Sequence, residues 1–150
     1  MLDIREYHSR EEMGKDVSQN ELVNFLHTHL DRFGDSNQAI NKCIDYAFSA
    51  KDGCGGFVIG GFIDGELVGA VVMNNTGMGG YIPENILVYV AVNSKFRNQG
   101  IGGKLVKHVI ENCKGDIKLH VEYDNPAKKL YERIGFENKY AKMRLIKEKK

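Results

Sequence analysis

The chain has 150 residues, and a domain of that length buries about 70% of the surface that its unfolded chain exposes, so a core can form without staples. Its 21 Lys and Arg residues balance 20 Asp and Glu residues, and a formal net charge of +1 favours neither nucleic acid nor an anionic membrane. Three widely spaced cysteines argue against a disulfide scaffold. The charged N-terminus argues against a signal peptide, and the apolar runs are too short for a membrane span. We therefore expect a cytoplasmic protein that meets charged ligands with local patches.

Periodicity and turn residues predict a chain that mixes helices and strands. The dipeptide Asp64–Gly65 between two β-rich runs is typical of a tight hairpin. Asn125–Pro126 before an apolar stripe is typical of a helix start. In chain order we expect a strand at 2–7, helices at 22–33 and 40–48, strands at 56–63, 66–73 and 86–92, a helix at 105–113, a strand at 117–123, a helix at 127–134, and strands at 136–140 and 142–146.

This order places hairpin-connected strands before a βαβ crossover. Hairpins give antiparallel pairs, whereas a crossover helix gives a parallel pair. Residues 86–92 are apolar without alternation, as in a strand buried on both faces. We therefore expect an α/β fold of the α+β kind, with a mixed sheet and helices on both faces. Because no linker or repeat divides the sequence, residues 1–150 are expected to form a single domain.

Glycines and cations gather between this buried strand and the helix that follows it. Residues 97–103 read Arg-Asn-Gln-Gly-Ile-Gly-Gly, and glycines let the backbone approach a ligand closely. The first N–H groups of the next helix, aided by its dipole, suit a phosphate or pyrophosphate. Leu105 excludes both a Walker A loop and a dinucleotide fingerprint. Four cations and no acid lie within 95–107, and the glycine context favours a ligand site over a solvated helix face: Lys95, Arg97, Lys104 and Lys107.

Two motifs here resemble the signature of the GNAT superfamily of N-acetyltransferases. The pattern Arg-x-x-Gly-x-Gly after a Val-Ala-Val strand resembles the loop with which that family binds the pyrophosphate of acyl-CoA. Downstream, Asn125-Pro126-Ala127 and the stretch Leu-Tyr-Glu-Arg-Ile-Gly-Phe at 130–136 resemble the second half of the signature. The resemblance covers residues 86–136. It implies a GNAT-like acyl-CoA N-acyltransferase fold, in which a central, mostly antiparallel sheet contains one splayed parallel pair.

The resemblance also implies an enzyme that transfers the acetyl group of acetyl-CoA to a primary amine by direct attack in a ternary complex. In the family, the pantetheine arm of CoA enters the gap between the splayed strands, which here would be 86–92 and 117–123. Asn125 lies at the mouth of that gap, and a role as helix N-cap explains this residue as well as a contact with the cofactor does. The cofactor-binding residues that the resemblance implies are Val90, Ala91, Val92, Arg97, Asn98, Gln99, Gly100, Ile101, Gly102, Gly103 and Asn125.

Amine attack on a thioester needs a deprotonated amine and a proton for the departing thiolate. Tyr131 resembles the family's general acid, although it also falls on an apolar helical stripe where a core aromatic would lie. Glu84, just ahead of the buried strand, is the carboxylate that the resemblance favours as base. The alternative interpretation is that Glu84 is an exposed loop carboxylate without a catalytic role. His120 competes with it because histidine titrates near neutral pH, and solvent can also take the proton.

Two other functional classes fit parts of the sequence. A CoA-binding regulatory or interaction module would keep the loop without turnover. A nucleic-acid module would use the basic tail from Lys139 to Lys150, but the near-zero net charge and the lack of a recognition motif disfavour it. No metal is expected, since His27 and His29 face different ways on a helix. The acceptor is expected to be a small-molecule or protein amine, with no nucleic-acid or membrane partner; a homodimer is one oligomeric state that the sequence leaves open.

Overall fold

A computed structural model describes residues 1–148, in which the chain separates into two units, one ending at Leu119 and the other beginning at His120. Lys149 and Lys150, the end of the basic tail, lie outside the described residues. None of the helices within residues 1–148 has the length and apolar character that a membrane-crossing helix requires. The expectation of a single domain over the whole chain stays a prediction.

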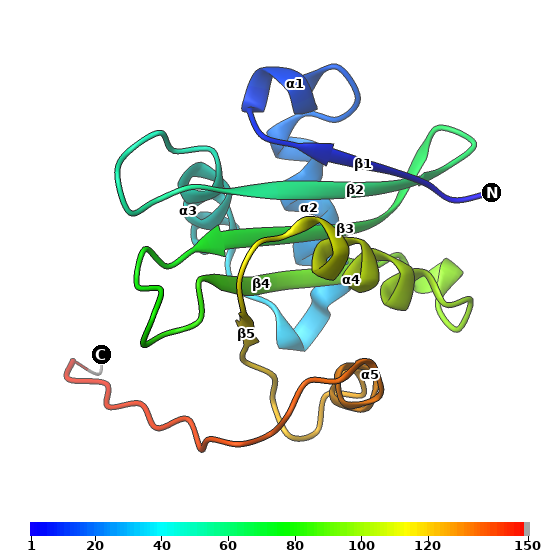
Figure 1. Cartoon of the computed structure of the whole chain (residues 1–150). Helices are drawn as coiled ribbons and strands as arrows, with labels where there is room; N and C mark the ends of the chain where they lie inside the picture. Colours follow the sequence, from blue (N-terminus) through cyan, green and yellow to red (C-terminus); the bar gives the residue numbers. More distant parts are fainter. Residues whose placement is uncertain (149–150) are drawn as a thin grey trace. The chain divides into compact units, whose positions relative to one another are not determined.

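A five-stranded mixed sheet forms the centre of the first unit (Figure 1). Antiparallel pairings join neighbours in the order β1-β2-β3-β4, and a parallel pairing adds β5 beside β4. The predicted mixed sheet with one parallel pair is therefore confirmed. The strands are β1 (Asp3–Tyr7), β2 (Gly56–Ile63), β3 (Glu66–Asn75), β4 (Asn85–Val92) and β5 (Ile117–Leu119).

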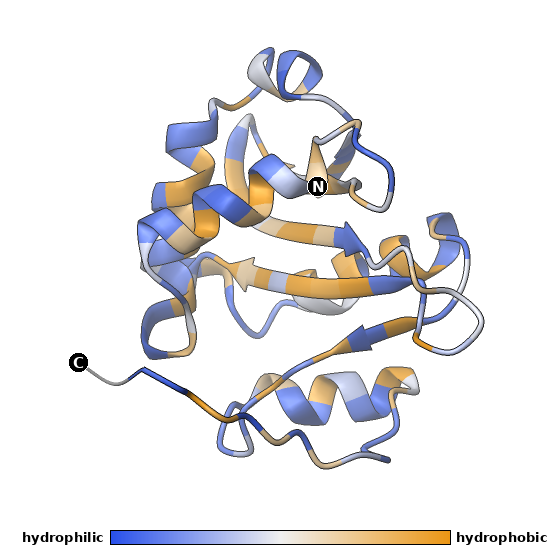
Figure 2. Ribbon diagram, turned by 90° about the vertical axis from the view of Figure 1, so that its left-hand side faces the viewer, coloured by the Kyte–Doolittle hydropathy of each residue, from blue (hydrophilic) through white to orange (hydrophobic). Residues whose placement is uncertain are grey.

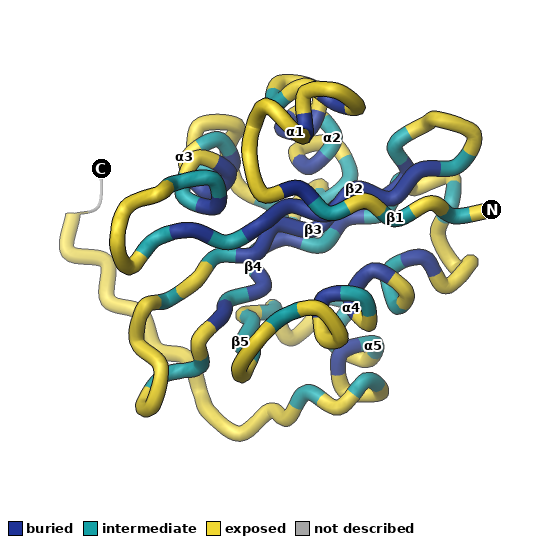
Figure 3. The backbone as a smooth tube through the Cα atoms, turned by 45° about the horizontal axis from the view of Figure 1, so that its top comes forward, coloured by how far each residue is buried: buried dark blue, intermediate teal, exposed yellow. Residues whose placement is uncertain are grey.

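Helices cover both faces of this sheet, as predicted (Figure 3). The sequence analysis missed the first of them, α1, because its five residues contain a single buried side chain, too few for a periodic pattern. One face carries α1 (Arg10–Gly14), α2 (Gln19–Leu30) and α3 (Asn37–Ala47), with the 3-10 turn η1 (Asp31–Phe33) between the last two. The other face carries α4 (Ile101–Asn112), which follows the 3-10 turn η2 (Ser94–Phe96).

Local turn and capping residues set where several of these elements begin. Asp64 and Gly65 have φ angles of 51° and 80°, so they form the left-handed two-residue turn that suits the twist of a β-hairpin. The predicted hairpin between β2 and β3 is therefore confirmed. Ser18 starts α2 in a capping box, in which its hydroxyl accepts a hydrogen bond from Glu21 N–H and the Glu21 carboxylate accepts one from Ser18 N–H.

The main core lies between the sheet and the helices α2 and α3. The apolar stripes of these helices face the strands (Figure 2). On the opposite face α4 packs closely against β3, because a Cβ atom at Gly69 would lie only 2.7 Å from Leu105 Cδ1. Core residues from the helices and strands include Leu22, Leu26, Ile40, Ile44, Val58, Ala70, Val72 and Tyr89.

Charged side chains join the edge strand β1 to the chain around it. Tyr7 donates a hydrogen bond to Asp16 Oδ2 at 2.7 Å, and Arg5 donates one to Asp16 Oδ1 at 2.7 Å. The hydrogen bond from Tyr7, followed by that from Arg5, lowers the pKa of Asp16. The carboxylate of Asp16 is therefore favoured in the folded state.

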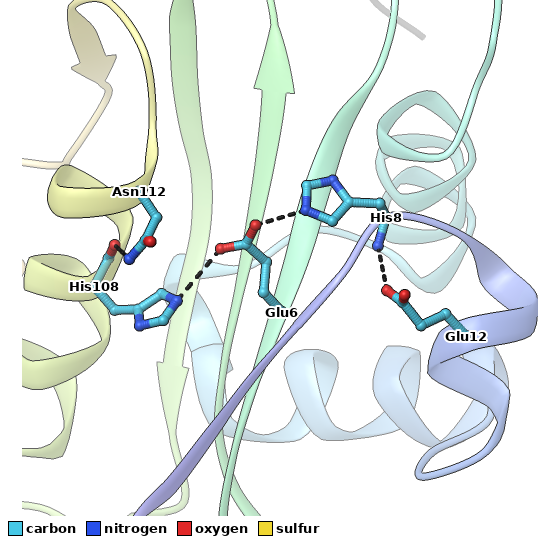
Figure 4. Close-up of polar contacts among 5 residues, drawn as sticks. All are labelled: Glu6, His8, Glu12, His108 and Asn112. Carbon is cyan, nitrogen blue, oxygen red and sulfur yellow. Dashed lines mark hydrogen bonds and ion pairs between the residues drawn. The ribbon is translucent and has the colours of Figure 1, made fainter.

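Glu6 joins β1 to α4 (Figure 4). Its Oε2 lies 2.6 Å from His8 Nε2, and its Oε1 lies 3.3 Å from His108 Nε2 in α4. The backbone N–H of His8 donates to Glu12 Oε1 at 2.9 Å. One carboxylate thus contacts both a histidine next to β1 and a histidine of α4.

The second unit contains one helix within its described residues, α5 (Ala127–Ile134). The helix begins at Ala127 as predicted, but its N-cap is Pro126 rather than Asn125. The Asn125 side chain accepts a hydrogen bond from Ala127 N–H at 2.9 Å. The helix ends at Gly135, which has a φ of 126° and donates its N–H to two carbonyls of the last turn. The predicted glycine cap is therefore confirmed as well.

The sequence analysis was wrong about the strands near the C-terminus. β5 spans Ile117–Leu119 rather than 117–123, and residues 136–148 form no strand. A strand needs a neighbour for its backbone hydrogen bonds, and within residues 1–148 no ladder extends beyond β5. Met143 and Leu145, expected on a strand face, are 92% and 85% exposed. Alternating apolar residues are a necessary signal for a strand, but without a partner they are not sufficient.

Candidate functional site

β4 loses its parallel neighbour part-way along its length. The β4–β5 ladder covers Asn85–Leu87 and Ile117–Leu119 only, whereas β4 continues to Val92. Opposite β3 the register shifts by one residue, so that Val88 is an extra residue, a β-bulge. A bulge bends its strand, and this one lies where the parallel pair ends. The edge of β4 beyond the bulge is therefore not paired with β5.

Backbone direction decides which peptide groups face this open edge. Asn93 N–H donates a hydrogen bond to β3 at 2.8 Å, so the peptide groups of Asn93 and, two residues earlier, Ala91 point toward β3. Those of Val90 and Val92 point the other way, toward the open edge. Val92 O accepts a hydrogen bond from Arg97 Nε at 3.3 Å on that side. Val90 and Val92 thus have the direction that the predicted cofactor contacts require, while the peptide of Ala91 serves β3.

Side chains at the start of β4 hold the paired end of the gap. Glu84 Oε1 accepts a hydrogen bond from Asp116 N–H at 2.8 Å, and this bond lowers the pKa of the Glu84 carboxyl. Asn85 is buried, and its Nδ2 donates to Lys114 O at 2.7 Å and to Asp116 O at 3.2 Å. The candidate base Glu84 therefore lies at the paired end, where it holds the turn that precedes β5.

The glycine loop leads into α4 without a side-chain cap. Asn98 and Gly100 have φ angles of 65° and 79°, and Gly100 is the N-cap residue. The helix ladder begins with Lys104 N–H donating to Gly100 O at 3.1 Å. The N–H groups of residues 101–103 precede that bond and are those that a helix leaves without an internal partner. With Lys104 and Lys107 exposed on the same helix, this arrangement suits a phosphate.

Arg97 anchors the loop to the protein. Its Nη2 donates to His29 O, near the end of α2, at 2.6 Å. The ring of His29 in turn accepts a hydrogen bond from Ser94 N–H at 3.3 Å, and burial, followed by the charge of Arg97, lowers its pKa. The sequence analysis missed this contact, because the two residues are 68 positions apart and no local pattern signals it. The loop residues Asn98 and Gln99 are exposed.

The other predicted site residues belong to the second unit. Tyr131 is buried in α5, with its ring edge-on to Phe136 at 5.8 Å between centroids, and burial raises its pKa to about 12. A raised pKa keeps the phenol protonated at neutral pH. Both the general-acid role and the core-aromatic role of Tyr131 are consistent with a protonated phenol. Asn125 accepts a hydrogen bond from the first residue of α5, Ala127, and His120 is exposed. The catalytic and cofactor-binding roles of these residues stay predictions.

Comparisons with known proteins support the motifs and the fold. The sequence profile of the acetyltransferase (GNAT) family matches residues 18–136, which include the gap, the loop and α5. The chain belongs to this family. Within the described residues of this GNAT chain, no group of three or more His, Cys, Asp or Glu side chains has the arrangement of a metal site.

Solved structures share the GNAT fold at low sequence identity. A transcriptional regulator from Bacillus halodurans C-125 has a TM-score of 0.69 at 20% identity, over 97% of this chain and 99% of that one. A ribosomal-protein-alanine N-acetyltransferase from Brucella melitensis biovar Abortus 2308 has a TM-score of 0.66 at 15% identity, with the same coverage of 97% and 99%. An aminoglycoside N-acetyltransferase, AAC(6')-Iy, solved in complex with CoA, has a TM-score of 0.63 at 16% identity, over 100% of this chain and 95% of that one.

A curated relative matches a short segment of this GNAT chain. The mouse cysteine-rich protein 2-binding protein is 37% identical over 54 residues, which are 35% of this chain and 7% of that protein. The human protein of the same name matches to the same extent. Because the chain spans so little of these relatives, the likeness concerns one segment and not their whole activity.

Proposed function

We propose that this GNAT chain is an N-acetyltransferase that transfers the acetyl group of acetyl-CoA to a primary amine. The observation that supports the proposal most is the succession, within the first unit, of an open β4 edge and an uncapped start of α4. The peptide groups of Val90 and Val92 suit the amides of a pantetheine arm. The N–H groups of residues 101–103, with Lys104 and Lys107 on the same helix, suit a pyrophosphate.

The proposed reaction takes place in a ternary complex. The amine nitrogen bonds to the acetyl carbon, the C–S bond breaks, and the CoA thiolate takes up a proton. Tyr131 is our candidate for the donor of that proton, since burial keeps its hydroxyl protonated. The base is less well supported, because the hydrogen bond that lowers the pKa of Glu84 also weakens it as a proton acceptor. His120 and solvent remain alternatives for this step.

Calorimetric titration with acetyl-CoA tests the cofactor site. Gly102→Pro removes one N–H group from the first turn of α4, where proline is tolerated, and Gly102→Ala keeps that group. Because a hydrogen bond to a charged group contributes about 1.5–3 kcal/mol, the proline variant should bind acetyl-CoA roughly 10–100-fold more weakly than the alanine variant. No binding of acetyl-CoA to the wild-type chain at high micromolar concentration would contradict the proposal.

Thiol release with mass detection of the product tests turnover. Structural relatives named for ribosomal-protein alanine and for aminoglycosides suggest the acceptor panel: a peptide with an N-terminal alanine, an aminoglycoside, a lysine peptide and small primary amines. A second candidate function, a CoA-binding regulatory module without turnover, is favoured by the relative named as a transcriptional regulator. Affinity for acetyl-CoA without any acetylated product would favour that alternative. The cytoplasmic location and a small-molecule or protein amine as acceptor belong to the same proposal.

Two substitutions test the proposed catalytic roles. Tyr131→Phe should lower kcat and leave acetyl-CoA affinity unchanged, and unchanged kcat would remove the general-acid assignment. Glu84→Gln keeps an oxygen that can accept the Asp116 N–H bond, so it removes basicity with little change to the turn. A wild-type rate across the pH profile of this variant would assign the base elsewhere.

A further inference from the structure

Tyr89 places a hydroxyl on the α2–α3 face of the sheet, directly after the bulge in β4. Its side chain is buried in the core cluster that α2 and α3 form with the sheet, so it points to the face opposite α4. Tyr89 is the second residue after Leu87, the last β4 residue that pairs with β5. Tyr89 therefore belongs to the unpaired stretch of β4, and its side chain lies on the face of the sheet that α2 and α3 cover.

Asp35 receives this hydroxyl. Tyr89 OH donates a hydrogen bond to Asp35 Oδ2 at 2.6 Å, across 54 positions of sequence. Asp35 lies in the loop between α2 and α3, next to Ser36, whose hydroxyl caps α3. The residue is exposed, and within the described part of the chain its second oxygen, Oδ1, accepts no hydrogen bond. One oxygen of the carboxylate is thus held by a buried side chain while the other faces solvent.

The charged groups near Asp35 leave this carboxylate without a partner cation. His27 Nδ1 lies 3.3 Å from the backbone oxygen of Asp35, not from its carboxylate. The guanidinium of Arg32 lies over the ring of Phe33, 4.2 Å from its centroid. Within residues 1–148 no ion pair joins Asp35 to a cation, so an exposed carboxylate in a fixed position is available to one from outside.

We infer that Asp35 binds the positively charged amine of the acceptor and that Tyr89 positions Asp35 for this purpose. The inference rests on the proposed function, which brings the thioester of acetyl-CoA to the unpaired stretch of β4. A primary amine is an ammonium ion at neutral pH. The charge-assisted hydrogen bond from an ammonium to a carboxylate oxygen is stronger than a bond between neutral groups. Glu84 is less suited to this role, because it lies at the paired end and its Oε1 is bonded to the turn before β5.

The charge of the nitrogen changes during the reaction. The ammonium first gives one proton to the base, which is Glu84, His120 or solvent. The neutral nitrogen then bonds to the acetyl carbon, the C–S bond breaks, and a second nitrogen proton ends on the CoA thiolate. The amide product has no charge at this nitrogen, so Asp35 binds the acceptor but not the acetylated product. Acceptors that present a charged amine should therefore be preferred over uncharged nucleophiles.

The test compares Asp35→Asn with Asp31→Asn, a matched control in the same loop. Asp31 is exposed, and its replacement by asparagine removes the charge while keeping the size of the side chain. With the best amine of the acceptor panel, Asp35→Asn should lower kcat/KM by roughly 10–100-fold, mainly through KM, because a charge-assisted hydrogen bond is lost. Acetyl-CoA affinity should stay within about twofold of wild type, and Asp31→Asn should leave both quantities within about twofold.

Competitive inhibition gives a readout that a merely structural role would not move. Wild type should bind the amine at least about tenfold more tightly than the alcohol of the same skeleton, and Asp35→Asn should lose this preference. Tyr89→Phe should raise KM by a smaller factor, since Asp35 keeps its charge but loses its position. An unchanged kcat/KM in Asp35→Asn, or an equal loss in Asp31→Asn, would overturn the inference. Absence of turnover in wild type would contradict the proposed function and the inference together, whereas turnover that Asp35→Asn leaves unchanged would contradict the inference alone.

Discussion

Replacing Asn85 by aspartate should weaken the paired end of the β4–β5 gap and make stability depend on pH in a new way. The side chain is only 5% exposed, and its Nδ2 donates to the carbonyl oxygens of Lys114 and Asp116 at 2.7 and 3.2 Å. Asn85→Asp puts an oxygen where the two donor hydrogens were. The variant therefore loses both hydrogen bonds and directs a buried negative charge at two carbonyl oxygens.

The size of the effect follows from these contacts. Two lost hydrogen bonds cost about 2 kcal/mol, at about 1 kcal/mol each. Burial without a donor raises the pKa of the new carboxyl in the folded state, and a rise of about two units adds roughly 3 kcal/mol when the carboxyl is ionised. The sum is about 5 kcal/mol at pH 8. Because the folded pKa exceeds the unfolded one, the added part disappears as pH falls toward the unfolded pKa, so the loss should shrink to about 3 kcal/mol near pH 4.5.

Urea unfolding followed by circular dichroism at pH 8 and pH 4.5 measures this difference. Asn85→Ala is the control, since it removes the same hydrogen bonds without adding a charge and should cost about 2–3 kcal/mol at both pH values. Each variant is compared with wild type at the same pH, which cancels the acid sensitivity of the other carboxyls. Equal losses in the two variants at pH 8, or a loss in Asn85→Asp that grows on acidification, would refute the reasoning.

Further substitutions test other parts of the fold. Gly56→Ala should cost about 3 kcal/mol or more in urea unfolding, because its Cβ would overlap a backbone oxygen of β3, whereas Gly53→Ala, with nothing within 4 Å, should cost about 1 kcal/mol for its positive φ. Ser18→Ala removes the capping box of α2 and should lower the melting temperature by the equivalent of about 1 kcal/mol. Glu6→Ala removes the two contacts of the Glu6 carboxylate drawn in Figure 4 and should cost about 1 kcal/mol in the same urea assay. The lowered pKa of Asp16 means that its carboxylate stabilises the fold above its unfolded pKa and stops doing so as pH falls through the folded pKa, so Asp16→Asn should reduce the loss of stability between pH 5 and pH 2.

Local signals in the sequence predict the elements that begin or end at characteristic turn and capping residues. Asp64–Gly65 forms the hairpin turn, α5 begins at Ala127 after Asn125–Pro126, and Gly135 ends it, as predicted. These features depend on a few neighbouring residues, so they can be read from one chain. The C-terminal strands were predicted from alternation alone, and alternation says which face a residue would occupy but not whether a neighbouring strand exists.

The candidate site also contains features that the sequence predicts and contacts that it does not. The glycine loop and the start of α4 are contiguous, and the motif predicts a helix after the loop. The helix begins at Ile101, four residues before the predicted start at 105, so Gly102 and Gly103 lie inside it. Other contacts of the loop and of β4 join residues far apart in the sequence: Arg97 donates to His29, and Tyr89 donates to Asp35, across 68 and 54 positions. No spacing rule predicts such pairs, because they form only when the helices pack on the sheet. The sequence analysis proposed Glu84 as the base, but the bond of its side chain to the turn before β5 became visible only in three dimensions.

The uncapped start of α4 has a consequence for stability as well as for binding. Most helices satisfy their first N–H groups with a side chain of the same protein, whereas Gly100 offers none. An anion bound at residues 101–103 would supply the missing acceptors, so the folded state alone would gain from it. At a ligand concentration of about 100 times Kd, that linkage raises the free energy of unfolding by about 2.7 kcal/mol. The melting temperature of this chain would then rise when the anionic ligand binds, because the ligand accepts the hydrogen bonds that a capping side chain would otherwise accept.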